Sequence, residues 1–356
     1  MSFRRYTPAT PPQIPSTAAS AHPSTTPQTL PSGVKPASIP CISTGTSSLD
    51  TLLSPSSGLP ISSSLLIEEE STGNYSGVIL RQYVAEGVIQ SHRIWIAGVG
   101  ESWWRGIPAL TNKPIKNDVA VQDLEEKMKI AWRYGANTPQ KNLRESGMEG
   151  FCHVFDIGEQ MALPGNEQVV FSPEPASQGN PYEPILSSLH SFIRNTSKTT
   201  AVRLVLPDLL NPLIYSPDSS QPQFLLQFFH SITSLVTRHP YATLLLSLST
   251  SFYPRSQPLT SWIEHLCTHV LQLCPLPQNP TLAKQPQGIV NVHKGGLMSK
   301  EMAYRVGRRG MVLEEWSLPP LEEESPRVKQ GFVIEQDVER VRKSHVSGIN
   351  AKDLEF

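Results

Sequence analysis

From residue 64 to residue 273, short apolar runs alternate with longer segments whose apolar residues recur at helical spacing. The runs SLLIEE (64–69) and ATLLLSLS (242–249) are apolar over most of their length, as strands buried on both faces are. The segment at 76–91 instead repeats apolar residues every three or four positions, which predicts a helix. This alternation predicts an α/β fold, with a mostly parallel sheet and helices on both of its faces.

The same patterns predict the remaining elements. Further strands are expected at 93–100, 152–157, 203–207 and 270–273, and further helices at 121–133, 184–196, 224–239 and 261–269. Three apolar runs between residues 288 and 318 predict an antiparallel group of strands at one edge of the sheet. Helix 224–239 is apolar on nearly all faces, which indicates a well-covered helix. The Pro-, Gly- and Gln-rich segment at about 163–181 is predicted to be a variable loop.

The two ends of the chain differ in composition from this central part. Residues 1–38 are rich in Pro, Ser, Thr and Ala, and such a segment cannot bury enough apolar surface to offset its ordering entropy. The last segment, after residue 320, is charged and poor in apolar residues. We therefore expect a disordered arm at 1–38, a folded domain at 39–320 and a charged, mobile tail at 321–356.

Composition limits the possible partners and compartments. The net charge of −1 gives no global electrostatic case for nucleic acid or membrane, so any basic surface must be local. No apolar run reaches the ~18 residues of a membrane span, and the N-terminal sequence MSFRRYTPATPPQIP lacks the apolar stretch of a secretory signal. The four cysteines form no CxxC pair, and we expect reduced thiols of an intracellular protein.

One segment invites a metal interpretation. HLCTHVLQLC (265–274) places His265 and His269 four residues apart, with two cysteines nearby. A zinc helix of the HExxH type would carry Glu after the first histidine, where this chain has Leu266. On a helix Cys267 would face away from both histidines, so a closed tetrahedral zinc site is not expected. The GxSxG pattern of serine hydrolases is absent, and the sequence predicts neither a metal nor a cofactor.

The start of the folded part resembles a known class of nucleotide-binding domains. Residues 43–74, STGTSSLDTLLSPSSGLPISSSLLIEEESTGN, resemble the opening of RecA-like and KaiC-like ATPases, from a Ser/Thr-Gly turn and a Leu-Asp pair to the strand before the phosphate loop. Downstream, KIAWRYG (129–135), FCHVFDI (151–157), RLVLPDLLNPLIY (203–215) and EEWSLPP (314–320) resemble the family of fourth Elongator subunits. The resemblance covers about residues 39–320 and implies a RecA-like domain.

The phosphate loop itself departs from the working pattern. A functional loop reads GxxxxGK[ST], in which backbone amides and the lysine hold phosphates and the hydroxyl binds magnesium. Aligned on Gly73, this chain has Glu68 at the first glycine, Asn74 at the lysine and Tyr75 at the hydroxyl position. The three carboxylates of Glu68–Glu70 would repel a triphosphate. They are interpreted as a solvated rim or a subunit contact.

A second nucleotide motif is also missing. A metal-orienting Asp should end the strand at 203–206, but Pro207 occupies that position. Asp208, one residue later, is interpreted as a turn or helix-capping residue. Together the two losses predict a degenerate phosphate loop on a fold that is retained as a scaffold.

The resemblance implies a non-catalytic subunit that joins the fifth and sixth Elongator subunits in a hetero-oligomeric RecA-like ring. Such a ring accompanies the catalytic Elongator subcomplex, which modifies the wobble uridine of tRNA, in the cytoplasm and nucleus. The alternative is an autonomous ATPase of the RecA or KaiC type. Candidate tRNA contacts are the basic residues Arg255, Lys294, Arg308 and Arg309. Candidate subunit contacts are Trp132, Arg133 and Tyr134.

Overall fold

The computed structural model describes residues 30–71, 73–111, 150–165, 167–277, 285–297 and 301–316. Six neighbouring parallel strands form most of its large sheet: β4 (Ser64–Glu69), β5 (Arg93–Ile96), β8 (Val169–Phe171), β9 (Val202–Leu209), β10 (Ala242–Ser249) and β11 (His269–Pro275). Three antiparallel strands extend it at one edge: β12 (Gly288–Lys294), β13 (Met302–Gly307) and β14 (Gly310–Glu315).

The strand order is that of a RecA-like domain. The nine strands follow the order β14-β13-β12-β11-β4-β10-β9-β5-β8. Numbered along the chain, the core strands β4, β5, β9, β10 and β11 lie side by side as 5-1-4-3-2. The predicted α/β class, mostly parallel sheet and antiparallel edge are therefore confirmed.

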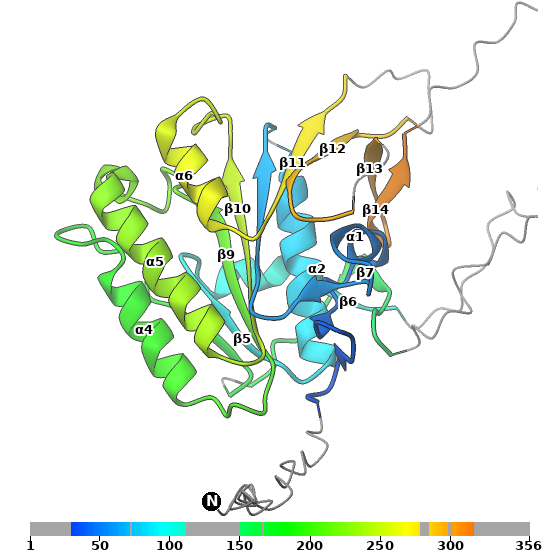
Figure 1. Ribbon diagram of the computed structural model, residues 1–356, viewed down its shortest axis with the longest axis horizontal. Coiled ribbons are helices and arrows are strands. Elements are labelled where there is room, and N and C mark those ends of the chain that lie inside the picture. Colours follow the sequence, from blue (N-terminus) through cyan, green and yellow to red (C-terminus); the bar gives the residue numbers. More distant parts are fainter. Residues whose placement is uncertain are drawn as a thin grey trace, which may run out of the picture. The chain divides into compact units, whose positions relative to one another are not determined.

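Helices cover both faces of the sheet (Figure 1). Three helices lie together on one face: α4 (Glu183–Arg194), α5 (Pro222–Arg238) and α6 (Pro258–Leu266). Helix α2 (Tyr75–Ile89) lies on the other, and α1 (Ser47–Leu53) packs beside β14. Two short 3₁₀ helices, η1 (Glu101–Gly106) and η2 (Pro217–Ser220), complete the helical elements that the structure describes.

The alternation of side chains along the strands explains the two-faced core. In β4, Leu65 and Ile67 pack into the apolar cluster on the α2 side, whereas Leu66 packs into the cluster on the α4–α6 side. Successive strand residues point to opposite faces, and both faces of this sheet are covered. A central strand therefore has to be apolar at nearly every position, as the continuous runs indicated.

Two small sheets lie outside the large one. One joins β1 (Val34–Lys35), β2 (Cys41–Ile42) and β3 (Leu59–Pro60), and the other pairs β6 (Pro108–Leu110) with β7 (Phe155–Gln160). The predicted strand at 152–157 was thus placed a few residues early, and its partner is β6 rather than a strand of the large sheet. Strand β1 also lies within the predicted arm, so ordered structure begins before residue 39.

Three further expectations are corrected. The predicted loop at 163–181 contains the edge strand β8, whose three residues are too few to show a strand pattern in sequence. Helix α5 buries only one face, since His230 and Thr237 are exposed. The helix predicted at 261–269 ends at Leu266, and His269 begins β11.

Three predicted segments lie wholly or mostly outside the described residues: the helix at 121–133, the tail at 321–356 and most of the arm. None of the helices described is both long and apolar enough to cross a membrane.

Candidate functional site

The turn between β4 and α2 is the place where a phosphate loop would lie, and a carboxylate fills its centre. Glu69 ends β4, and its Oε1 accepts hydrogen bonds of 2.9 Å from the backbone nitrogen of Tyr75 and from the Ser71 hydroxyl. Its Oε2 accepts a 2.9 Å bond from the backbone nitrogen of Ser76 and a 2.5 Å bond from the Ser76 hydroxyl. The side chain is buried, so this carboxylate is a structural part of the turn.

These donors are the groups that a phosphate loop directs at phosphate. The first amides of a helix have no partner within the helix, and the helix dipole adds a partial positive charge there. Together they make a helix N-terminus an anion site. In this chain Tyr75 and Ser76 are the first two residues of α2, and the anion that their amides hold is Glu69.

Two of the three residues that replace the phosphate-binding signature, Asn74 and Tyr75, have structural contacts within the turn. The Tyr75 ring packs against Tyr304 of β13, with ring centroids 5.1 Å apart. It also covers Gly73, where an added Cβ would lie 2.4 Å from the Tyr75 ring. Asn74 has a left-handed backbone (φ 53°), which Asn tolerates better than most residues. Its side chain lies against Gly77 of α2, where a Cβ would come within 2.1 Å of Asn74 Oδ1.

The second nucleotide motif is replaced by an irregularity in β9. Strand β9 continues through Pro207 to Leu209, and its register with β10 shifts opposite this point. Asp208 has a positive φ of 45°, and its backbone nitrogen donates to the Ser247 hydroxyl. Burial and the negative charge of Glu69 raise the pKa of Asp208, while the nearby Arg81 opposes the shift. Asp208 is therefore a bulged strand residue on the Glu69 side of the sheet. Its carbonyl also accepts a 3.0 Å hydrogen bond from the backbone nitrogen of Asn211, so it begins a turn, which is one of the two roles predicted for it.

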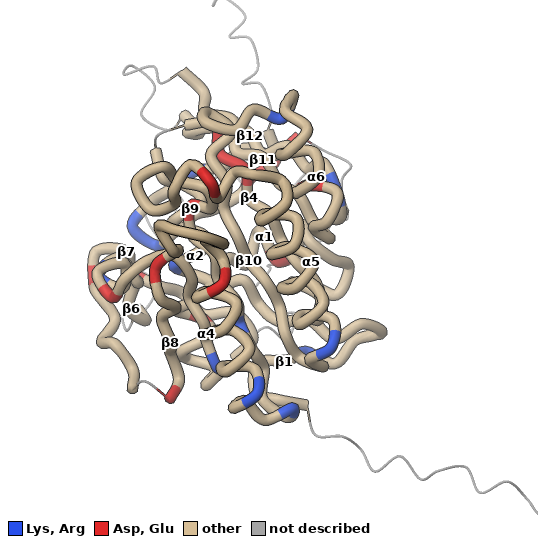
Figure 2. The backbone as a smooth tube through the Cα atoms, turned by 90° about the vertical axis from the view of Figure 1, so that its left-hand side faces the viewer, with Lys and Arg blue, Asp and Glu red and all other residues tan. Residues whose placement is uncertain are grey.

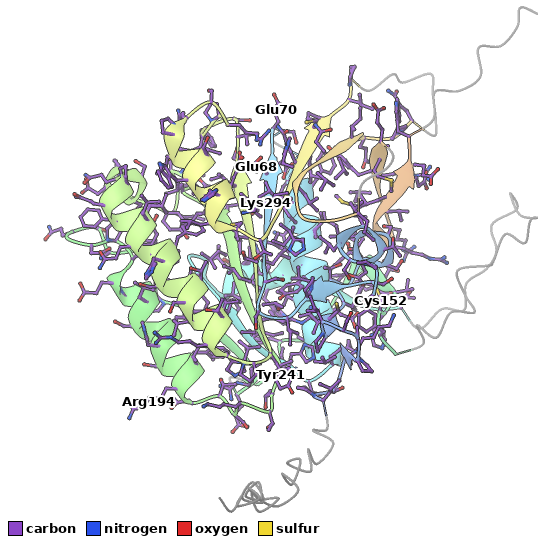
Figure 3. All side chains as sticks on the ribbon, in the orientation of Figure 1. Glu68, Glu70, Cys152, Arg194, Tyr241 and Lys294 are labelled. Carbon is purple, nitrogen blue, oxygen red and sulfur yellow. The ribbon has the colours of Figure 1, made fainter. Side chains whose placement is uncertain are left out.

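Glu68 points to the opposite face from Glu69 and forms an acid pair with the partly exposed Glu264, around Arg255. Its Oε2 lies 3.2 Å from Nε of Arg255, and Arg255 also donates to both oxygens of Glu264, at 2.8 and 2.9 Å. Figure 3 shows Glu68 and Glu70 at the end of β4. Glu68 and Glu69 are buried and only Glu70 is exposed, so the expected solvated rim is wrong for the first two.

The acid pair carries one proton at neutral pH. Burial raises the pKa of Glu68 to about 8, with the charge of Glu264 and a hydrogen bond to it adding to the effect. Burial alone would raise the pKa of Glu264 as well, but the hydrogen bonds from Arg255 and Glu68 outweigh it and lower that pKa. Glu68 is therefore the protonated member. Arg255, a candidate tRNA contact, has its charge matched by the ionised Glu264.

The other candidate tRNA contacts lie at two separate places. Lys294 ends β12, and its Nζ donates a 2.7 Å hydrogen bond to the carbonyl of His265 on α6. Arg308 and Arg309 lie in the β13–β14 turn, at a pocket of about 410 Å³ that Arg305 also lines. Arg308 Nε donates to both carboxylate oxygens of Asp156 on β7, whereas Arg309 has no charged partner among the residues described. Figure 2 shows basic and acidic segments interspersed over the fold rather than gathered into one basic face.

The sequence also predicted a subunit contact and raised the question of a metal site. Trp132, Arg133 and Tyr134 lie outside the described residues, so their predicted subunit contact stays a prediction. Within the ranges that the structure covers, no group of three or more His, Cys, Asp or Glu side chains is arranged to hold a metal ion.

At the phosphate loop, the sequence showed which phosphate-binding groups are missing, but it did not identify Glu69 as the anion that takes their place. The available signal was a helix N-terminus that needs an acceptor, directly after a strand that ends in glutamates.

The sequence of the chain matches a protein family and several named relatives. Residues 26–356 match the family described as PAXNEB protein. Elongator complex protein 4 of Schizosaccharomyces pombe is 32% identical over 342 residues, covering 87% of this chain and 94% of that protein. The proteins of the same name from Saccharomyces cerevisiae and Xenopus laevis are 24% and 25% identical, covering 81% and 78% of this chain and 76% and 80% of their own lengths.

Among solved structures, a KaiC-like protein from the hyperthermophilic archaeon Pyrococcus horikoshii OT3 aligns with 78% of this chain and 99% of its own. Its TM-score is 0.44 and its sequence identity 13%. The family match spans nearly the whole chain, and the fission yeast relative is similar over nearly its full length. The chain therefore belongs to the PAXNEB family, that of Elongator complex protein 4.

Proposed function

We propose that this chain is a non-catalytic subunit of the Elongator complex. Two observations support this: membership of the Elongator complex protein 4 family, and the Glu69 carboxylate on the amides that would otherwise receive a phosphate. The second observation carries the non-catalytic part of the proposal. A helix N-terminus whose first two amides already hold a buried carboxylate offers fewer donors to a triphosphate, and a second anion there would meet a like charge.

In this proposal the chain joins the fifth and sixth Elongator subunits in a hetero-oligomeric RecA-like ring. The ring binds tRNA in the cytoplasm and nucleus, and it supports wobble uridine modification by the catalytic Elongator subcomplex. The exposed Arg309 and the Lys294 ammonium, which is bonded only to a neutral carbonyl among the described groups, offer phosphate contacts. The subunit contact expected at Trp132, Arg133 and Tyr134 belongs to the same proposal.

An autonomous RecA- or KaiC-type ATPase is the second candidate, and the site argues against it. The lysine position holds Asn74, whose side chain lies against α2, and the hydroxyl position holds Tyr75, whose ring packs on Tyr304. Neither residue can neutralise a phosphate or bind magnesium as the working loop does. Nucleotide hydrolysis, if the ring performs it, then depends on the other subunits.

The test is co-purification of the tagged full chain, followed by tRNA binding to the assembly that it brings down. We expect the fifth and sixth Elongator subunits in stable amounts, and an assembly that binds tRNA. Arg309→Ala should leave the assembly intact and weaken tRNA binding, with a salt dependence shallower by about one unit of slope. Arg133→Glu should instead weaken the assembly. Cells lacking the gene should carry undermodified wobble uridines.

Each part of the proposal can fail separately. Purification of the chain alone, without other Elongator subunits, would contradict the assembly role. Normal wobble modification in cells that lack the gene would contradict the link to tRNA modification. An intact assembly that does not bind tRNA would leave the subunit assignment standing and remove tRNA binding from it.

A further inference from the structure

Helix α6 presents an aromatic side chain to solvent. Trp262 is 53% exposed, whereas the Thr260 and Ile263 side chains of the same helix are buried. The Trp262 indole meets the His265 ring edge-on, with ring centroids 6.4 Å apart and an interplanar angle of 88°. The two rings meet at nearly a right angle, and about half of the Trp262 side chain stays open to solvent as a large apolar surface.

Two adjoining pockets flank this helix. The first has a volume of about 390 Å³ and is lined by Pro258, Ser261, Trp262 and His265. The second has a volume of about 300 Å³ and shares Ser261 and His265 with the first; its other lining groups include the charged Arg255, Glu264 and Lys294. An aromatic pocket and a charged pocket thus lie side by side along α6.

The second pocket has a positive balance of charge. Arg255 is matched by Glu264, with which it shares two hydrogen bonds. Lys294 has no such match here, since its Nζ is bonded to the neutral carbonyl of His265 at 2.7 Å. Figure 3 shows Lys294 beside the end of α6, below Glu68. His293 also lines the pocket, and its Nε2 is bonded to the uncharged Gln272. The ammonium of Lys294 is therefore available to an anion.

We propose that this face binds single-stranded RNA, with an unstacked base on the Trp262 indole and the adjoining phosphate at Lys294. Proteins bind single-stranded nucleic acid through aromatic side chains that stack on bases, placed beside basic groups that follow the backbone. The two pockets supply both chemistries at adjacent positions. The inference rests on the proposed tRNA-binding function and assigns one of its contacts to an unpaired segment. It concerns a place separate from the Arg308–Arg309 turn.

The experiment measures binding of a fluorescently labelled single-stranded RNA oligonucleotide, and of tRNA, to the co-purified assembly. Trp262→Ala should weaken binding of both about tenfold or more, since base stacking on one aromatic side chain contributes that much. Trp262→Phe should keep most of the affinity, because a smaller ring still stacks. Lys294→Gln should reduce the dependence of log K on log salt by about 0.7 for the single-stranded RNA.

The matched control is Phe252→Ala, because Phe252 is a 58% exposed aromatic residue that lines neither pocket. It should leave RNA binding unchanged, and an equal loss in this variant would overturn the assignment to Trp262. Unchanged RNA binding in Trp262→Ala would also overturn it. If that variant instead lost a protein partner while RNA affinity stayed the same, the face would be a subunit interface. An assembly that binds no tRNA even with Trp262 in place would remove tRNA binding from the proposed function, whereas tRNA binding that does not depend on Trp262 refutes this inference alone.

Discussion

The carboxylate of Glu69 lies 2.9 Å from the backbone nitrogen of Ser76, within the first turn of α2. A strand–turn–helix unit of this kind needs an acceptor for its helix N-terminus, whether or not a nucleotide is present. In a working enzyme the phosphate supplies that acceptor for part of the cycle. In this chain the acceptor is covalently attached, so the shape of the phosphate loop persists without its lysine and hydroxyl.

Glu69→Ala should lower the free energy of unfolding. The substitution removes the acceptor of four hydrogen bonds, from two backbone amides and two hydroxyls. It also removes a favourable charge at a helix N-terminus, so we expect a loss of about 2–3 kcal/mol. Urea denaturation of the purified chain measures it. Glu70→Ala is the control, since Glu70 is exposed and should change stability by less than about 0.5 kcal/mol. Equal stability of the two variants would mean that the Glu69 contacts contribute nothing.

The full chain should not bind Mg-ATP with micromolar affinity. Its helix amides hold Glu69, and Asn74 cannot neutralise phosphate charge. Isothermal titration calorimetry should show no saturable heat. Glu69→Ala should not restore binding either, because it frees the amides without supplying a lysine or a magnesium ligand. A micromolar isotherm with the unaltered chain would contradict this interpretation of the loop.

The stability of the chain should fall as Glu68 loses its proton. Folded Glu68 keeps its proton up to a pH of about 8, while an unfolded glutamate releases it near 4.5. Between these values the unfolded state binds fewer protons, so the contribution of Glu68 is full below about pH 4.5 and is lost as the pH rises through about 8. The steepest expected slope is about 1.4 kcal/mol per pH unit.

Glu68→Gln isolates this effect, because glutamine keeps the shape of the protonated acid and does not titrate. We expect the free energy of unfolding of the variant, relative to the unaltered chain, to rise steadily from pH 5 to pH 8. Other titrating groups, such as the buried Asp50, are common to both proteins and cancel in the comparison. A pH-independent difference between the two proteins would show that Glu68 is ionised throughout.

The sequence predicted the large sheet well because its central strands are buried on both faces. Strands β4 and β10 were placed at their observed bounds, since a continuous apolar run ends abruptly where cover ends. Strand β8 was missed because an edge strand of three residues is held by pairing with β5, which no local pattern records. Helix α5 was predicted to be covered on nearly all faces, but its outer face is exposed. Ser and Thr side chains on this face donate hydrogen bonds to carbonyls of the helix itself, so they need no covering element.

For the site, sequence identified the lost groups but not the groups that replaced them. Asn74 and Tyr75 depart from a known pattern and can be seen by alignment alone. The roles of Glu68 and Glu69 depend on strand alternation, which sends one carboxylate to Arg255 and the other to α2. Three consecutive glutamates look alike in sequence, and only the cover on each face of the sheet distinguishes them.

Removal of residues 1–29 should leave the melting temperature nearly unchanged, whereas removal of residues 1–38 should lower it by about 5–10 °C. The difference lies in strand β1 and its approach. Val34 is 7% exposed and pairs with Ile42 of β2, so its loss removes a buried side chain and uncovers its neighbours.

A second contact strengthens the expectation. The ring of His92 bonds through Nε2 to the carbonyl of Ser32 at 2.7 Å, and its Nδ1 accepts from Nε of the buried Arg203 at 2.9 Å. Burial and the charge of Arg203 lower the pKa of His92 to about 3, so the ring is neutral and Nε2 carries the donated proton. Deleting Ser32 takes away that acceptor. Together with Val34 the loss should reach about 3 kcal/mol, measured as the difference between the two truncations in thermal unfolding. Equal melting temperatures would show that β1 adds nothing to the stability of the fold, and that the stable domain begins at residue 39 as the sequence predicted.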